Sequence, residues 1–175
     1  MTATEVYQLT AQGGASDFQQ LIEICASLGS YCLIGGLAVN CYVEPVYTLD
    51  ADLVFIASAL PDLAARLSEE GFKLEHHRQS VYATSQGSQV RIRFTTDNRY
   101  QSFIPRSVEA ELLGVRVRVA CLEDVAEGKL WAYSDPNRRF SRRKKDELDL
   151  IRLAEEYPEL KSRYPRELVD MMERG

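Results

Sequence analysis

"LIGGLAVNCYVEPVYTLDADLVF", which runs from Leu33 to Phe55, raises the main question of this sequence. Two glycines, Gly35 and Gly36, open the stretch, and two aspartates, Asp50 and Asp52, close it at the edge of an apolar run. Two carboxylates where a strand enters the core either bind a cation or are ordinary turn residues. The pattern around them favours the first interpretation.

The glycines are expected to lie between a strand and a helix. Tyr31 to Ile34 is short and apolar, which predicts a buried strand, and Leu37 to Val43 predicts a helix. Glycine lets the backbone approach a ligand closely, and the free N–H groups at the start of a helix can hold a phosphate. A second apolar strand, Leu53 to Ala57, is entered directly from the two aspartates.

Asp50 and Asp52 are two residues apart, so on a strand their side chains point to the same side. Two carboxylates on one side repel each other unless a positive charge lies between them. Mg²⁺ is the usual answer, because it binds one or two carboxylates and completes its coordination with substrate phosphates. A strand-helix-strand hairpin would bring this cation site to the glycine turn, which is the arrangement that a Mg²⁺–nucleoside triphosphate site requires.

The rest of the chain predicts an α+β domain with helices covering one face or end of a sheet. Valine and isoleucine alternate with arginine in two stretches, which is typical of half-buried strands. The predicted strands are residues 72–76, 80–84, 90–95 and 115–119; the predicted helices are residues 16–28, 61–70, 122–133 and 142–157, with a short one from Pro165. The first dozen residues are expected to be frayed.

Length and composition limit the classes of protein. With 175 residues, one domain over 1–175 is expected, with a core over about 16–120 and a helical part over about 121–175. The net charge of −5 argues against nonspecific coating of nucleic acid but allows a local basic patch. The four cysteines form no C-x-x-C pair, and no signal peptide precedes them, which predicts reduced thiols in a cytoplasmic protein. No apolar run approaches the roughly 20 residues of a membrane span.

The pattern G-G-x(n)-T-x-D-x-D, at Gly35, Gly36, Thr48, Asp50 and Asp52, resembles the signature of the nucleotidyltransferase fold shared by the DNA polymerase β superfamily. Within it, the sequence is similar to the AbiEii-like group of small bacterial nucleotidyltransferases, some of which are toxins of toxin–antitoxin pairs. The resemblance covers roughly residues 31–153 and implies a mixed β-sheet core, helices on one face and a helical C-terminal part.

The second half of the resemblance lies in "VRVRVACLEDVAEGKLWAYSDPNRRFSRRKKDELDLIRL", residues 115–153. Lys129 matches a lysine on the group's first helix there, and Asp146 matches the aspartate of its K-D-x-x-D motif. Asp50 and Asp52 would then hold Mg²⁺ against a triphosphate such as ATP, and Lys129 would pair with the phosphates. Asp146 would orient Lys129 or accept the proton of the acceptor hydroxyl. An ordinary exposed lysine, and an aspartate paired with Arg142 on its own helix, are the alternatives.

The sequence departs from the group's pattern at two places. The group commonly has a basic residue two positions before the threonine, where this chain has Val46. Members with two metal ions carry a third carboxylate on a later strand, but the outward positions of the matching strand are Arg91 and Arg93. Either Asp146 supplies that carboxylate, or one metal suffices, or catalysis is weakened. The two arginines either grip phosphates or form a solvated strand face.

The basic segment from Asn137 to Lys145 precedes or begins a helix, where positive charge opposes the helix dipole. An RNA acceptor that contacts Arg138, Arg139, Arg142 and Arg143 would explain it; a solvated helix start is the alternative. Two functional hypotheses follow: a metal-dependent nucleotidyltransferase, or a degenerate member that binds nucleotide or a protein partner such as an antitoxin.

Overall fold

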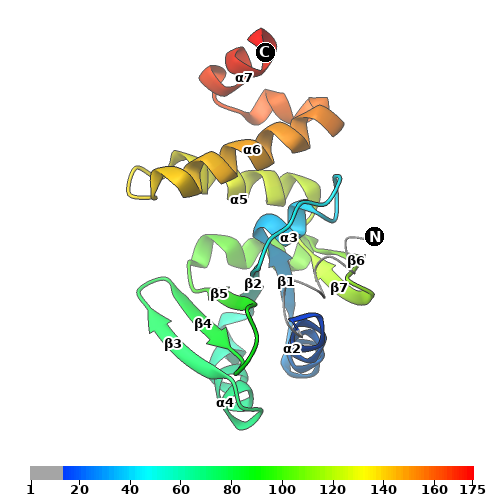
Figure 1. Cartoon of the computed structure of the whole chain (residues 1–175), viewed down its shortest axis with the longest axis vertical. Coiled ribbons are helices and arrows are strands. Elements are labelled where there is room, and N and C mark those ends of the chain that lie inside the picture. Colours follow the sequence, from blue (N-terminus) through cyan, green and yellow to red (C-terminus); the bar gives the residue numbers. More distant parts are fainter. Residues whose placement is uncertain (1–13) are drawn as a thin grey trace.

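The computed structural model describes residues 14–175, and its centre is a seven-stranded mixed sheet (Figure 1). The expectation for the first dozen residues falls outside this range. The strand order across the sheet is β3-β4-β5-β2-β1-β7-β6. The strands are β1 (Tyr31–Ile34), β2 (Asp50–Phe55), β3 (Lys73–His77), β4 (Ser80–Thr84), β5 (Arg91–Thr95), β6 (Val108–Leu112) and β7 (Val115–Val119).

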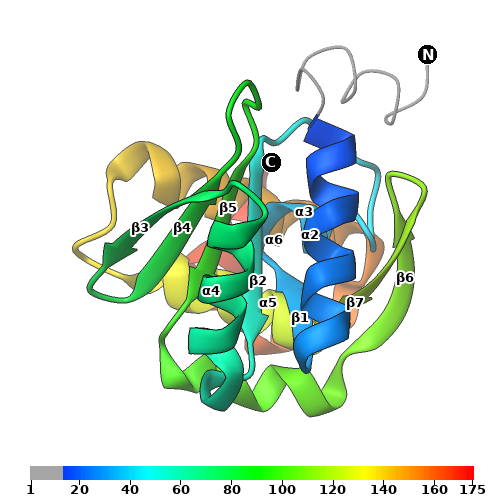
Figure 2. The same ribbon diagram turned by 90° about the horizontal axis from the view of Figure 1, so that it is seen from below.

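Helices lie on both sides of this sheet. The α-helices are α2 (Gly14–Leu28), α3 (Gly35–Val39), α4 (Leu60–Glu69), α5 (Leu122–Ser134), α6 (Phe140–Glu156) and α7 (Arg166–Arg174), and the 3₁₀ segments are η1 (Ala57–Ala59), η2 (Asn98–Arg106) and η3 (Pro158–Arg163). Figure 2 shows α2 and α4 side by side on one face of the sheet, with α5 and α6 behind it. The α+β fold class with a helical C-terminal part is therefore confirmed.

The central strands are antiparallel at β1–β2 and parallel at β2–β5 and β1–β7. The turn that leaves β1 through α3 brings the chain back antiparallel, so Ile34 pairs with Asp52. All residues of β1 are buried, since helices cover both of its faces. The predicted strand-helix-strand hairpin is thus present, with its glycines beside the second aspartate.

Two of the expected elements have clearly different bounds, and the second strand also ends at Phe55 rather than Ala57. The second strand begins at Asp50 rather than Leu53, because β2 continues its pairing with β5 as far as the register of Asp50 with Arg91. The helix after the glycines ends at Val39, because the side chain of Asn40 donates to the carbonyl of Val46 (2.7 Å) and accepts from its N–H (3.1 Å). These two bonds close a loop in place of further helical turns.

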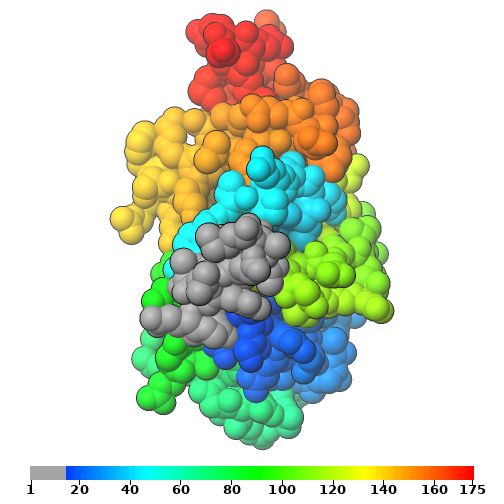
Figure 3. Space-filling view, turned by 45° about the vertical axis from the view of Figure 1, so that its right-hand side comes forward, coloured from blue at the N-terminus to red at the C-terminus, as the bar shows by residue number. Residues whose placement is uncertain are grey.

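The C-terminal helices are joined to the sheet by the segment after α3. In Figure 3, the cyan atoms of this segment lie directly against the orange atoms of the C-terminal helices. Tyr42 donates from its hydroxyl to the carbonyl of Ala120 (2.7 Å), and Tyr157 donates to the carbonyl of Tyr42 (3.1 Å). One continuous cluster of buried apolar residues runs from Phe18 on α2 to Leu168 on α7. Among residues 14–175, no helix has both the length and the apolar character that crossing a membrane requires.

Candidate active site

The two aspartates of the opening stretch lie on one face of β2. Asp50 and Asp52 are partly exposed there, whereas Ala51 between them is buried on the opposite face. The parallel register pairs Asp50 with Arg91 and Asp52 with Arg93 of β5. Two acidic and two basic side chains therefore share one face of adjacent central strands.

Gly35 and Gly36 lie against the two polar residues that the sequence pattern associates with them. Gly35 has a φ of +71°, and a Cβ built on it would lie 2.4 Å from Oδ2 and 3.0 Å from Cβ of Asp52. A Cβ on Gly36 would lie 3.7 Å from Oγ1 of Thr48. Only glycine fits at Gly35, because any side chain would displace Asp52. The glycine turn is thus part of the aspartate site.

Asp50 is held by two arginines from distant parts of the chain. Arg91 donates from Nε (3.0 Å) and Nη2 (2.8 Å) to Oδ1, and Arg142 donates from Nη1 to Oδ2 (2.8 Å). Burial alone would raise the pKa of Asp50, but the hydrogen bonds and charges of Arg142 and Arg91 outweigh burial and lower the pKa below its usual value. Asp50 is therefore ionised at neutral pH, with both oxygens occupied.

Asp52 has one arginine partner. Arg93 donates from Nε to Oδ1 at 2.6 Å, and the charge of Asp52 raises the pKa of Arg93 above its usual value. The other oxygen of Asp52, Oδ2, faces Gly35. This oxygen accepts no hydrogen bond from a residue in the described part of the chain, so it has no protein donor to lose when a ligand binds.

A second charged cluster joins α5 to α6. The Nζ atom of Lys129 lies 2.9 Å from Oδ1 of Asp146 and 2.7 Å from Oδ2 of Asp149. Arg138 donates to Oδ2 of Asp146 (2.6 Å), and Arg152 donates to Oδ1 of Asp149 (2.8 Å). Burial would lower the pKa of Lys129, but Asp149 and Asp146 outweigh it and raise that pKa. Lys129 is 8% exposed and paired with two carboxylates, so the alternative of an ordinary exposed lysine is wrong.

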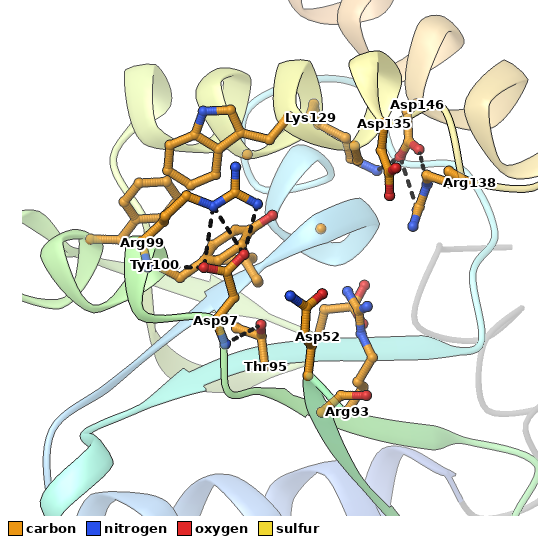
Figure 4. Close-up of a pocket in the computed structure, with 18 of the residues that line it drawn as sticks. Asp52, Arg93, Thr95, Asp97, Arg99, Tyr100, Lys129, Asp135, Arg138 and Asp146 are labelled. Carbon is orange, nitrogen blue, oxygen red and sulfur yellow. Dashed lines mark hydrogen bonds and ion pairs between the residues drawn. The ribbon is translucent and has the colours of Figure 1, made fainter. Parts of the chain in front are cut away.

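The two clusters face each other across a polar cleft. Gly36, Thr48, Asp50, Asp52, Lys129 and Asp146 line one small cavity of about 50 Å³ together with Arg142. A larger cavity of about 1020 Å³ extends from Asp52, Arg93 and Lys129 toward Asp97, Arg99 and Tyr100. Figure 4 shows Lys129 and Asp146 on one wall of this cavity and Asp52 and Arg93 on the other.

The predicted site residues thus converge, and the structure adds others that the sequence interpretation missed. The residues brought together are Gly35, Gly36, Thr48, Asp50, Asp52, Arg91, Arg93, Lys129 and Asp146. Asp149, the second aspartate of the K-D-x-x-D motif, was not predicted as a site residue. Arg142 was assigned to RNA, although its position early in a helix, against the dipole, signalled a specific partner. That partner is Asp50, so the suggested pairing of Arg142 with Asp146 is wrong.

The basic segment is only partly a free surface. Arg138 and Arg142 are paired with aspartates of the cleft, whereas Arg139 is exposed and Arg143 is partly exposed. The aspartate partners explain two of the four arginines of this segment without an RNA acceptor. The unfavourable charge near the start of α6 is offset by these ion pairs.

The positions of the carboxylates in the cleft determine whether a divalent cation can bind there. Among residues 14–175, no three histidine, cysteine, aspartate or glutamate side chains lie close enough together to hold a metal ion, so Asp146 does not complete a three-carboxylate site with Asp50 and Asp52. Asp50 and Asp52 do line the same two small cavities, and no residue in the described part of the chain donates to Oδ2 of Asp52. The donor set therefore fits one cation, provided that a guanidinium releases Asp50.

Among the comparisons with known proteins, only the comparison with solved structures gives matches. No protein-family model matches the sequence, and a comparison with curated proteins gives no match. The antibiotic-resistance factor ANT(2'')-Ia is 14% identical, with a TM-score of 0.59 over 90% of both chains. LnuA, a lincosamide antibiotic adenylyltransferase with lincomycin bound, is 13% identical, with a TM-score of 0.55 over 81% of this chain and 95% of its own. An antigenic nucleotidyltransferase-like protein from Paracoccidioides brasiliensis is 18% identical, with a TM-score of 0.54 over 80% of this chain and 74% of its own.

These likenesses do not address the narrower resemblance to the AbiEii-like group, which stays a prediction. They do support the α+β fold described above, because the similarity extends over at least 80% of this chain. The chain shares the fold of these nucleotidyltransferases.

Proposed function

We propose that the protein transfers a nucleotidyl group from a nucleoside triphosphate to a hydroxyl acceptor, with release of pyrophosphate. The observation that carries this proposal is the close packing of Gly35 on Asp52 within a cleft whose opposite wall holds Lys129. Gly35 and Asp52 both line the large cavity, so the backbone of the glycine turn and a carboxylate adjoin the same space.

The charges of the cleft suit a polyphosphate. Around the two small cavities, four carboxylates face six cationic side chains, which leaves an excess of two positive charges; the carboxylates are those of Asp50, Asp52, Asp146 and Asp149, and the cations those of Arg91, Arg93, Lys129, Arg138, Arg142 and Lys145. A local excess of one sign of charge raises the local concentration of ligands of the opposite charge. Planar guanidinium groups also match phosphate oxygens in geometry. We assign triphosphate binding to Arg91, Arg93, Lys129 and the backbone at Gly35 and Gly36, with Thr48 beside them.

Mg²⁺ is the cofactor that this donor set favours, held by Asp50 and Asp52. When bound, it would neutralise phosphate charge and promote departure of pyrophosphate. Asp146 is an orienting residue rather than a proton acceptor, because Lys129 and Arg138 occupy both of its oxygens. Its role is to hold the ammonium of Lys129 at the cavity wall.

A small molecule is the acceptor that the cleft favours. The large cavity, at about 1020 Å³, is of the size that holds a drug-sized ligand. The neighbour ANT(2'')-Ia is known in complex with adenylyl-2''-tobramycin, and LnuA with lincomycin. An RNA acceptor would have to use Arg139 and Arg143, because Arg138 and Arg142 are engaged in the cleft. A toxin role and an antitoxin partner stay predictions from the resemblance.

The second candidate is a module that binds nucleotide without transferring it. The observation that favours it is Arg93, which stands beside Asp52 where the resemblance places a third carboxylate. A guanidinium cannot hold a second metal ion.

Pyrophosphate release separates the two candidates. The protein is incubated with each of the four ribonucleoside triphosphates and Mg²⁺, with a panel of acceptors that includes aminoglycosides, lincosamides and transfer RNA. We expect pyrophosphate in amounts equal to a modified acceptor for at least one pair. The Asp50→Asn variant is expected to lose this activity, while Asp170→Asn, on exposed α7, is expected to keep it.

Binding is measured in parallel by calorimetry with non-hydrolysable triphosphate analogues. Binding without pyrophosphate release for any acceptor would support the second candidate. No binding of any triphosphate, with or without Mg²⁺, would contradict both candidates and leave a protein-interaction domain.

A further inference from the structure

Arg142 lies in the cleft but has no role in the proposed function. It comes from the first turn of α6, 92 residues after Asp50, and its ion pair with Asp50 joins the two walls of the cleft. It lines both small cavities beside Asp50 and Asp52. An arginine at this place blocks the carboxylate oxygen that a cation would need.

The ion pairs of Asp50 can break at low cost. The side chains of Arg142 and Arg91 are 40% and 52% exposed, and that of Asp50 is 22% exposed. Ion pairs with this much solvent contact contribute little to stability. By contrast, the pair of Arg93 with Asp52 is less exposed, at 30% and 17%. Asp50 is therefore the carboxylate whose partners can exchange without unfolding.

The charge balance shows what the exchange requires. If a divalent cation alone displaced Arg142 and Arg91 from Asp50, two guanidinium groups would lose their counter-charge beside the excess of positive charge in the cleft. If a polyphosphate entered alone, it would compete with Asp50 for the same guanidinium groups. When both enter together, the cation takes the carboxylate and the phosphates take the arginines, so every charge keeps a partner.

We propose that Arg142, together with Arg91, exchanges the Asp50 carboxylate for phosphate, so that polyphosphate and divalent cation bind to the cleft cooperatively. Arg142 is thus a phosphate-binding residue and a gate on the cation site. Coupling of this kind is reciprocal: the cation strengthens phosphate binding by the same factor as phosphate strengthens cation binding. This inference rests on the proposed function, because it places the same ligand in the same cleft.

The test uses inorganic tripolyphosphate as a probe that lacks a base, and Mn²⁺ as a paramagnetic substitute for Mg²⁺. For the wild type, calorimetry is expected to show tripolyphosphate binding at least about tenfold weaker in EDTA than as its Mg²⁺ complex. Electron paramagnetic resonance is expected to show weak binding of Mn²⁺ alone. For Arg142→Gln, Mn²⁺ alone is expected to bind about tenfold more tightly, because one charge-assisted bond no longer competes for Asp50.

Two further variants complete the test. Asp50→Asn is expected to bind tripolyphosphate in EDTA more tightly than the wild type does and without dependence on Mg²⁺, because its two arginines are already released. Lys144→Gln is the matched control, since Lys144 lies in the same turn as Arg142 but its ion pair within residues 14–175 is with Glu147 on its own helix. It is expected to behave as the wild type in both measurements. Arg91→Gln repeats the Arg142 experiment from the other partner, and circular dichroism checks that each variant is folded.

The possible outcomes separate this inference from the proposed function. Independent binding of Mg²⁺ and tripolyphosphate, or equal Mn²⁺ affinity in the wild type and Arg142→Gln, would overturn the exchange while leaving nucleotidyl transfer intact. Cooperative binding without pyrophosphate release would keep the exchange in a non-catalytic module. No binding of either probe would overturn both.

Discussion

At the scale of single residues, the glycine turn allows a sharp test. Gly35 combines a positive φ with direct contact to Asp52, whereas Gly71, at the end of α4, has a φ of +89° and no atom within 4 Å of a built Cβ. We expect Gly71→Ala to lower the free energy of unfolding by about 1 kcal/mol, from backbone strain alone. Gly35→Ala should cost about 1–3 kcal/mol more, because the Cβ of Asp52 cannot rotate out of the way.

Urea unfolding of the two variants measures this difference, and calorimetry measures triphosphate binding. Gly35→Ala is also expected to reduce triphosphate affinity, while Gly71→Ala is expected to leave it unchanged. Equal destabilisation by the two substitutions would mean that Asp52 moves aside freely and that the contact does not position it.

The sequence allowed the relative positions of site residues to be predicted where these residues have a regular spacing. Asp50 and Asp52 lie two apart, so strand geometry alone placed them on one side. Their partners were not predictable, because Arg142 meets Asp50 only through tertiary folding across 92 positions. The parallel register of β2 with β5, which sets Arg91 beside Asp50 and Arg93 beside Asp52, leaves no local pattern in the chain.

At the scale of secondary-structure elements, ion pairs of Lys129 connect α5 to α6. Its ammonium bridges Asp146 and Asp149, which lie one turn apart on α6 and are both buried. Replacing Lys129 with methionine keeps the aliphatic length but removes the charge. We expect a loss of about 3 kcal/mol in the free energy of unfolding at pH 7, the lower part of the range for a broken buried pair, because each aspartate keeps one arginine.

The free energy of unfolding that Lys129 contributes should change with pH in a defined direction. The pKa of Lys129 is raised in the folded protein, so its stabilisation is complete below the ordinary lysine value of about 10.4 and is lost as pH rises through the higher folded value. The stability gap between wild type and Lys129→Met, measured by urea unfolding, should therefore narrow at high pH. Lys144→Met, on the exposed face of α6, should cost less than about 1 kcal/mol. If the difference in the free energy of unfolding between wild type and Lys129→Met stayed constant at high pH, the stabilising ion pairs of Lys129 with Asp146 and Asp149 would be contradicted.

Elements were predictable where the chain alternates or repeats clearly. The strand Val115–Val119 and the helix beginning at Leu122 appear at the expected residues. Strand β6 was not expected, because three of its five residues are Glu109, Glu111 and the exposed Val108, and its pairing with β7 at the sheet edge decides its structure. The predicted helix after the glycines is too long, because hydrophobic periodicity does not indicate that the side chain of Asn40 forms hydrogen bonds with Val46.

At the scale of the whole molecule, the cleft depends on the C-terminal helices and the sheet remaining together. The sheet carries Asp50 and Asp52, while α5 and α6 carry Lys129, Arg142 and Asp146, so neither part alone holds the proposed site. The continuous apolar cluster from α2 to α7 argues that both parts fold as one unit. The single domain over 1–175 stays a prediction until that unit is tested.

The single tryptophan makes this test direct. Trp131 on α5 stacks on Phe103 of η2, with ring centroids 5.4 Å apart, and contacts Tyr100 edge-on at 5.0 Å, so its fluorescence reports the contact of the helical part with the sheet part. We expect urea unfolding followed by this fluorescence to coincide with unfolding followed by far-ultraviolet circular dichroism. Phe103→Leu, which weakens the contact by about 1 kcal/mol, should shift both curves equally. If the fluorescence change instead came first, and Phe103→Leu moved that change alone, the helical part would be a separate domain, and the cleft would open before the sheet unfolds.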